Sequence, residues 1–200
     1  AEVMVTPTIR MMRAGEEAAI PLELQAARYL THDENVALAD RIGAIAARYP
    51  DDPAVLALHA RVLIDAERYT EAQTQADRAI AISATNSRAL TYRGIAMFKQ
   101  HEEDSQPMTP ALINQARGFI IRGNRADPED QVPLIAYYRS FGWADEPAPM
   151  LALDGLHKAM RLVPQEDSLR MELCMALIRR RSVAPDGARN LSIARNLLTP

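Results

Sequence analysis

The chain has one cysteine, Cys174, no long apolar run, and a content of aromatic residues of only 5% in 200 residues. A single thiol cannot form an intramolecular disulfide, so a disulfide-stapled scaffold is excluded. No segment approaches the ~18 consecutive apolar residues of a membrane-spanning helix, so we expect no membrane span. The formal net charge of −3 gives no overall basic field, which argues against a nucleic-acid partner bound through net charge.

Motifs for catalysis and cofactor binding are also missing. The sequence has no Gly-rich phosphate loop, no HExxH, and no base signature that would pair with Cys174. The best candidate for a metal site is the run His101 to Asp104, but consecutive residues of a charged turn need not converge on one point. We therefore predict a protein that is not an enzyme and has no metal and no cofactor, and we expect Cys174 to be a core thiol.

Alanine and arginine are abundant instead. Only two lysines, Lys99 and Lys158, stand against twenty-one arginines, and apolar residues make up 48% of the chain. Alanine and arginine both have high helix propensity, whereas β-branched and aromatic residues, which favour strands, are few. The composition therefore predicts an all-helical protein with a substantial core.

A period of about thirty-four residues runs through the chain. The segment Pro53 to Asn86 is one full unit, and the sequence from Ser87 begins a second unit that matches it. A proline-containing joint, ARYPDDPAV at 47–55, recurs at 126–134 and 162–170, as expected where one helix stops and another starts. Because a helical hairpin cannot bury its apolar face alone, the units must stack into a solenoid.

The period divides the chain into an extended lead-in over 1–15 and a solenoid over 16–200. The expected repeats are 16–52, 53–86, 87–130, 131–166 and 167–200. In the third repeat, His101 to Ala111 adds roughly ten residues to the thirty-four-residue norm, and its two prolines and charge run predict a long loop. The last repeat has no polar capping helix after it, which leaves self-association through this repeat as an alternative function.

This pattern resembles a tetratricopeptide repeat (TPR) array. In that family the eighth place of each first helix is small, and here Ala26, Ala60, Gly94 and Cys174 match while Tyr138 departs. The twentieth and twenty-seventh places are also small, as they are at Ala72 and Ala79, Ala116 and Gly123, and Ala152 and Ala159. The family's first-position tryptophan is missing, and the residues that stand there instead are Leu22, Leu56, Leu90, Leu134 and Arg170. The resemblance implies an all-α, right-handed α-solenoid of about five helix-turn-helix repeats and a role in protein–protein interaction.

A second resemblance concerns the segments 7–24 and 130–141. They are similar to the carboxy-terminal repeat region of some bacterial envelope or secreted proteins that carry a metallopeptidase-like domain upstream. This resemblance implies an alternative function, in which the chain is a regulatory or substrate-presenting arm of an upstream hydrolase. No catalytic residue is carried over to this chain from that resemblance.

The TPR resemblance also implies a concave groove, lined by places two, five, nine, twelve and thirteen of each first helix. The candidate partner-binding residues at these places are Arg61, Arg88, Thr91, Phe98, Lys99, Arg139, Trp143, Met171 and Arg179. Arginines on successive helices could bind the carboxylates of an acidic peptide through bidentate hydrogen bonds. The alternative is that these arginines pair with Asp or Glu of neighbouring repeats. A chaperone-tail carboxylate clamp is disfavoured, because Glu23 and Ala27 stand at two of its places.

Overall fold

The computed structural model describes residues 13–26, 30–104, 108–180 and 187–198, and these residues form ten α-helices and no strand. The helices are α1 (Ala14–Ala26), α2 (His32–Arg48), α3 (Pro53–Asp65), α4 (Tyr69–Ile82), α5 (Ser87–Glu103), α6 (Pro110–Ala126), α7 (Gln131–Trp143), α8 (Met150–Leu162), α9 (Asp167–Arg180) and α10 (Gly187–Leu198). None of these helices combines the length and the apolar character that crossing a membrane requires.

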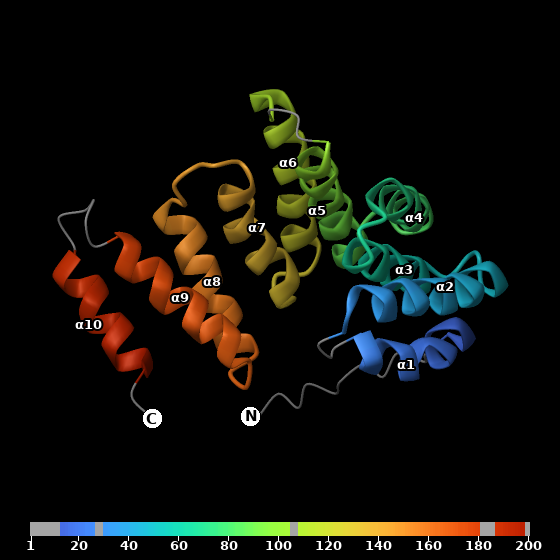
Figure 1. The fold of residues 1–200 in the computed structure, drawn as a ribbon, viewed down its shortest axis with the longest axis horizontal. Coiled ribbons are helices and arrows are strands. Elements are labelled where there is room, and N and C mark those ends of the chain that lie inside the picture. Colours follow the sequence, from blue (N-terminus) through green and yellow to red (C-terminus); the bar gives the residue numbers. More distant parts are fainter. Residues whose placement is uncertain (1–12, 27–29, 105–107, 181–186, 199–200) are drawn as a thin grey trace, which may run out of the picture.

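The helices follow one another in adjacent pairs, from α1 and α2 at the right of Figure 1 to α9 and α10 at the left. Each helix packs against the next one in the chain, and the first helices of successive pairs also pack together, α1 on α3, α3 on α5 and α5 on α7. This is an all-α solenoid, so the fold class predicted from the period is confirmed.

Side-chain caps start the helices at the joints between pairs. Asp52 precedes Pro53, and its Oδ1 accepts a hydrogen bond from the amide of Ala54 at 3.0 Å. Asn86 caps α5 in the same way, and Asp130 caps α7 through the amide of Val132 at 3.0 Å. Such side chains satisfy amides that have no partner inside the helix, and proline suits the first turn because its missing N–H is not needed there.

Small residues set the close approach within the pairs. Gly94 on α5 lies against Ala116 of α6, where the methyl group of an alanine would come within 3.0 Å of a backbone oxygen. Gly123 on α6 lies equally close to Thr91. Absence of a side chain at these two places lets the helix backbones approach, which is the role that the family pattern implies for them.

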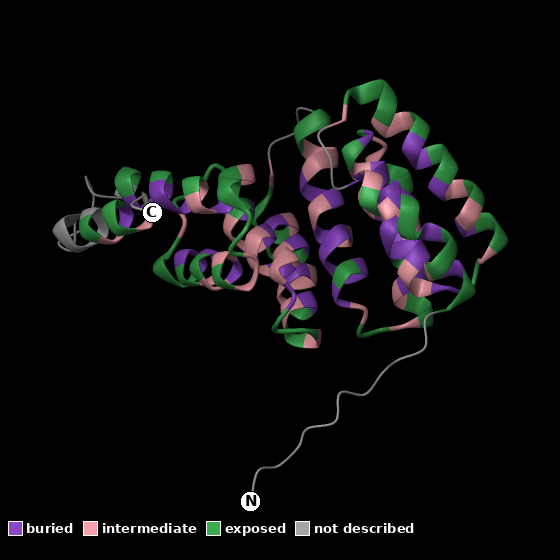
Figure 2. Cartoon of the chain, turned by 90° about the horizontal axis from the view of Figure 1, so that it is seen from below, coloured by how far each residue is buried: buried purple, intermediate pink, exposed green. Residues whose placement is uncertain are grey.

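The apolar core is divided along the row of helices. Figure 2 shows buried residues in each part of the row, not in one central core. One buried cluster extends from Ala19 on α1 to Ala96 on α5. A second joins α5, α6 and α7, and a third joins α8, α9 and α10 with Tyr138 of α7 against it. Neighbour-to-neighbour burial of this kind is typical of repeat proteins.

Two predicted segments differ from the helix bounds or lie partly outside the described residues. The loop predicted over His101 to Ala111 is too long, because α5 continues to Glu103 and α6 begins at Pro110. Much of the insertion lengthens these two helices to 17 residues each, against 13 in α3 and 14 in α4. The predicted lead-in lies outside the described residues up to residue 12, and α1 already begins at Ala14.

Candidate functional site

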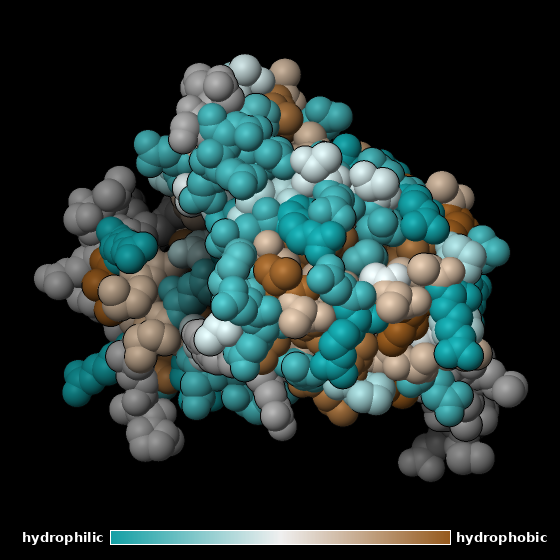
Figure 3. Space-filling view, turned by 45° about the vertical axis from the view of Figure 1, so that its right-hand side comes forward, coloured by the Kyte–Doolittle hydropathy of each residue, from teal (hydrophilic) through white to brown (hydrophobic). Residues whose placement is uncertain are grey.

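Two hollows open between first helices. We call the exposed sides of the first helices α1, α3, α5, α7 and α9 the first-helix face. The N-terminal hollow has a volume of about 280 Å³ and lies between α1, α3 and α5. The C-terminal hollow has a volume of about 780 Å³ and lies between α7, the turn after it, and α9. From the side shown in Figure 3, apolar side chains form separate patches divided by hydrophilic ones.

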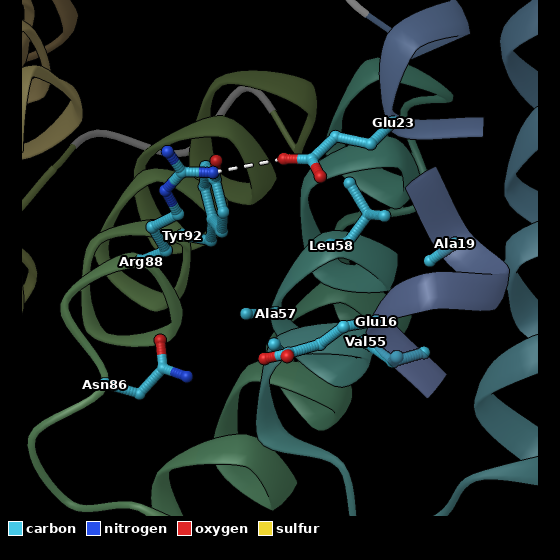
Figure 4. Close-up of a pocket in the computed structure, with 10 residues that line it drawn as sticks. Glu16, Ala19, Glu23, Val55, Ala57, Leu58, Asn86, Arg88 and Tyr92 are labelled. Atoms are coloured by element: carbon cyan, nitrogen blue, oxygen red, sulfur yellow. Dashed lines mark hydrogen bonds and ion pairs between the residues drawn. The ribbon is translucent and has the colours of Figure 1, made fainter. Parts of the chain in front are cut away.

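The N-terminal hollow has an apolar floor and a charged rim (Figure 4). Ala57 and Leu58 of α3 form part of the floor, and Glu23 of α1 faces Arg88 of α5 across it. One guanidinium nitrogen of Arg88 lies 3.3 Å from Oε1 of Glu23. Beside it, burial raises the pKa of Tyr92, so this phenol stays protonated at neutral pH.

Arg88 also connects α5 to the start of α7. Its Nε lies 3.4 Å from Oδ2 of the buried Asp130, and the hydroxyl of Ser87 donates to the same oxygen at 3.3 Å. Both distances from Arg88 to a carboxylate exceed the ~2.7–2.9 Å of a strong charge-assisted hydrogen bond. Arg88 is therefore held by two acidic residues of its own chain, but loosely.

The other predicted arginines have partners within the chain as well. Arg61 donates to the carbonyl of Ala26 at the end of α1, at 2.9 Å. Arg139 makes a bidentate pair with Glu172, with N–O distances of 3.1 and 2.7 Å. For Arg139 the structure thus shows the pairing with a neighbouring repeat that the sequence left open as the alternative. Arg88 pairs instead with Glu23 of the first repeat and with Asp130 at the end of its own repeat. Arg179 lines the C-terminal hollow.

Two predicted groove residues lie in the core instead. The side chains of Thr91 and Phe98 are 0% and 1% exposed, so neither can contact a partner directly. The reason is that α5 is packed by α3, α4, α6 and α7, which cover places that are open on a less crowded first helix. Thr91 donates to the carbonyl of Ser87 at 2.8 Å, and the ring of Phe98 lies 5.5 Å from that of Trp143.

The remaining predicted residues are accessible to different degrees. Trp143 is half-buried and lines the C-terminal hollow, with the ammonium group of Lys99 5.5 Å from its ring centre. Lys99 is also paired with Glu102 at 2.7 Å. Met171 is 54% exposed on α9.

The C-terminal hollow is the place where the regular stacking of first helices opens. No Cα atom described in α7 lies within 8 Å of one described in α9, whereas the earlier first helices approach one another within that distance. Tyr138 occupies the eighth place of α7, which is small in the other four first helices, and it lines the hollow. A small residue at this place lets a neighbouring helix approach closely, whereas the larger side chain of a tyrosine occupies that space. A greater distance between α7 and α9 is therefore expected here.

Sequence reasoning missed part of the wall of the C-terminal hollow. Pro147 and Pro149 in the turn after α7, and Leu153 on α8, line it together with the first helices. The family's places assign the groove to first helices alone, so these residues were not candidates. The proline pair in the turn was the available signal, because prolines hold a turn in a fixed shape.

Two other kinds of site, a metal site and a reactive thiol, were considered in the described parts of the chain. No group of three or more His, Cys, Asp or Glu residues there is placed to hold a metal ion. Cys174 is buried, its Sγ lies 3.6 Å from the carbonyl of Ala194, and burial raises the pKa of its thiol. A thiol in this environment stays protonated and unreactive at neutral pH.

Comparison with known proteins identifies the fold. No family model matches the chain, and no curated protein matches it. A crystal structure of a thermophilic TPR protein in Thermus thermophilus has a TM-score of 0.62 at 14% identity and covers 92% of this chain and 99% of its own. MamA from Desulfovibrio magneticus RS-1 has a TM-score of 0.55 at 15% identity and covers 94% of this chain and 97% of its own. The fold is therefore TPR-like over nearly the whole chain.

Proposed function

We propose that this protein is an interaction scaffold whose first-helix face binds a segment of a partner protein. The observation that carries the proposal is the presence of two hollows on that face, each bounded by first helices of neighbouring pairs. Solenoids present an extended surface of this kind and use it to hold other chains. A partner could therefore be a separate protein or a domain of the same polypeptide, as the arm of a hydrolase would require.

An acidic segment is the ligand we favour for the N-terminal hollow. Arg88 is 47% exposed in its side chain, and its two ion pairs are long, so a partner carboxylate can replace Glu23 without breaking a strong bond. Arg139 differs, because its short bidentate pair with Glu172 would have to be broken first. We therefore expect Arg88, and not Arg139, to supply the preference for acidic residues.

Selection of peptides from a displayed random library on the purified protein tests the function. We expect the selected peptides to bind the wild type and to lose at least ten-fold in affinity for the double variant Arg88→Ala/Gly142→Phe, which alters both hollows. The control is Arg78→Ala, because Arg78 is an exposed arginine on α4, away from both hollows. Peptides that bind the double variant as tightly as the wild type would overturn the proposal.

Self-association is a second candidate, favoured by one feature of α9. Met171, Met175 and Ile178 are exposed apolar residues at spacings of four and three, so they form one stripe along the helix. An apolar stripe of this kind on the last pair can serve as a contact between copies. Light scattering at increasing concentration decides this, since a dimer that the Met175→Glu variant abolishes supports it and a strict monomer excludes it.

A further inference from the structure

The N-terminal hollow already contains a carboxylate of its own chain opposite Arg88. Three charged side chains line this hollow, Glu16 and Glu23 of α1 and Arg88 of α5. Glu16 contacts the start of its own helix, where its Oε2 accepts a hydrogen bond from the amide of Arg13 at 2.9 Å. Glu23 faces Arg88 instead, as the dashed line in Figure 4 shows. Glu23 therefore occupies the position that an acidic residue of a partner needs.

The glutamate at this place is particular to the first helix of the row. Glu23 directly follows Leu22, which stands at the first-position place of the family. The residues at the same place of the other four first helices are Ala57, Thr91, Ile135 and Met171. None of these four side chains carries a charge. The ion pair of Glu23 with Arg88 is thus not a contact that the repeat itself requires.

Glu23 uses only part of the guanidinium group of Arg88. Nη1 donates to Oε1 of Glu23 at 3.3 Å, and Nε lies 3.4 Å from Oδ2 of Asp130. Among the described residues, no hydrogen bond uses Nη2 of Arg88. A carboxylate that binds Nη1 and Nη2 together forms the bidentate pair that arginine favours, and it leaves Asp130 in place. Such a carboxylate binds Arg88 better than Glu23 does.

Exposure makes Glu23 the replaceable partner of Arg88. The side chains of Arg88 and Glu23 are 47% and 46% exposed, whereas that of Asp130 is 6% exposed. An exposed ion pair contributes little to stability, and Glu23 returns to water without leaving a buried charge unpaired. Asp130 is buried and stays with Arg88 in either state. Displacement of Glu23 therefore has a small cost, which every acidic ligand bound at Arg88 must meet.

We propose that Glu23 is an internal competitor for the carboxylate site at Arg88. It lowers the affinity of an acidic segment bound there, and it favours segments whose carboxylate contacts Nη1 and Nη2 together over those that contact one nitrogen. Glu23 is thus the residue that sets affinity and specificity at this end of the first-helix face. The inference rests on the proposed function, because it requires a partner carboxylate at Arg88.

Two glutamates of α1 provide matched variants. Glu23→Gln removes the competing charge with almost no change of shape. Glu17→Gln removes the same charge from an exposed residue of the same helix that does not line the hollow. Both variants therefore alter the net charge equally, and only one of them alters the contact with Arg88. Circular dichroism establishes that both are folded.

The probe is the acidic peptide that binds the wild type most tightly in a selection from a displayed random library. Titration calorimetry gives its affinity for each variant. We expect Glu23→Gln to raise the affinity about three-fold, the size expected when a competitor held by an exposed ion pair is lost. Glu17→Gln should change the affinity by less than about 1.5-fold, because an exposed charge outside the hollow is screened.

The same substitution in the Arg88→Ala variant separates competition from repulsion. If Glu23 acts by occupying Arg88, Glu23→Gln gives no gain in affinity once the guanidinium group is absent. If Glu23 acts by repelling the acidic peptide, the gain persists in the Arg88→Ala variant. A persistent gain would overturn the inference.

Two further outcomes would also overturn the inference. They are an unchanged affinity for Glu23→Gln and an equal gain for Glu17→Gln. If the peptide still loses affinity for Arg88→Ala in these cases, the proposed function stands and only the role of Glu23 fails. A selection without acidic peptides, or a peptide that binds Arg88→Ala as tightly as the wild type, would remove the proposed preference for acidic residues and this inference with it.

Discussion

Some glycine residues in these helices lie against the backbone of a neighbouring helix, and others face open space. A Cβ at Gly123 would come within 3.0 Å of Thr91 and of the carbonyl of Ser87, whereas one at Gly118 or Gly142 would meet nothing within 4 Å. We expect Gly123→Ala to lower the free energy of unfolding by about 1–3 kcal/mol through overpacking. Gly118→Ala should raise it by about 0.5–1 kcal/mol, since alanine is the better helix former.

Urea denaturation followed by circular dichroism measures both changes. The prediction concerns the sign, because the two substitutions are chemically identical and differ only in what the added methyl group meets. If Gly123→Ala and Gly118→Ala shift the unfolding midpoint in the same direction, the close approach of α5 and α6 at Gly123 is wrong.

His59 on α3 is a residue whose environment makes stability depend on pH. Burial, and next the nearby Arg68, lower the pKa of His59 to about 4 from the ordinary value of 6.5. Its Nδ1 is buried without a hydrogen-bond partner. Since the unfolded chain binds the proton at a higher pH than the folded chain does, the folded state loses stability as the pH falls from 6.5 toward 4.

We expect the wild type to lose about 1–2 kcal/mol from this group over that range, allowing for partial exposure of the ring to solvent. His59→Leu should show a smaller loss between pH 7 and pH 5, the range above most carboxylate titration. The exposed His157 of α8 provides the control, as His157→Leu should leave the slope unchanged. Equal slopes for the wild type and His59→Leu would contradict the assignment.

At the scale of elements, the joint before α7 combines a helix cap with a contact between repeats. Asp130 accepts hydrogen bonds from the amide of Val132 and from the hydroxyl of Ser87, and it forms an ion pair with Nε of Arg88. Asp130→Ala should lower the free energy of unfolding by about 1–3 kcal/mol, because the cap is lost and the partners are left unpaired. Asp130→Asn should cost less, since asparagine is an equally good cap.

The control for this joint is Asp127→Ala, at an exposed aspartate three residues earlier in the same turn. Thermal or urea unfolding ranks the three variants. A loss for Asp130→Asn as large as that for Asp130→Ala would mean that the charge, and not the cap, is the main contribution of this residue.

The all-helical repeat fold could be predicted from the sequence because its signals are local. Prolines and capping residues mark the joints, and small residues at fixed places mark the contacts within a pair. The loop predicted over His101 to Ala111 was too long, because proline was interpreted as a helix breaker, whereas Pro110 stands at the first turn of α6, where proline is favourable. Hydrogen bonds from Lys99 and Gln100 to Glu102, Glu103 and Asp104 accompany the continuation of α5.

The site was harder to predict than the fold because it depends on neighbours. Thr91 and Phe98 occupy the same places on α5 as Met171 and Ile178 occupy on α9, yet the first two are buried and the last two are exposed. The difference comes from the number of helices around α5, which no local pattern states. Likewise, the ion pair of Arg139 with Glu172 joins residues 33 positions apart, and their distance is set by how two pairs stack.

At the scale of the whole molecule, the helix pairs pack on their neighbours and do not share one central hydrophobic core. The first buried cluster involves helices up to α5, and the third involves α7 to α10, so no apolar cluster includes both ends of the described chain. In such a row, the free energy of unfolding is close to the sum of the intrinsic stabilities of the helix pairs and of the interaction energies between neighbouring pairs. Local opening at one end therefore need not involve the other.

Among successive first helices in the described residues, α7 and α9 are the pair that does not approach within 8 Å between Cα atoms. We expect amides of α9 and α10 to exchange hydrogen faster than those of α3 to α5, because α9 and α10 share few buried contacts with the rest. Leu156→Ala, in the third cluster, should remove about 2–5 kcal/mol locally and speed exchange in α8 to α10 alone. Leu63→Ala, in the first cluster, should speed exchange in the helices of that cluster and leave exchange in α8 to α10 unchanged.

Hydrogen exchange with peptide-level mass spectrometry separates these regions. Uniform acceleration along the chain in both variants would show one cooperative unit and contradict a divided core.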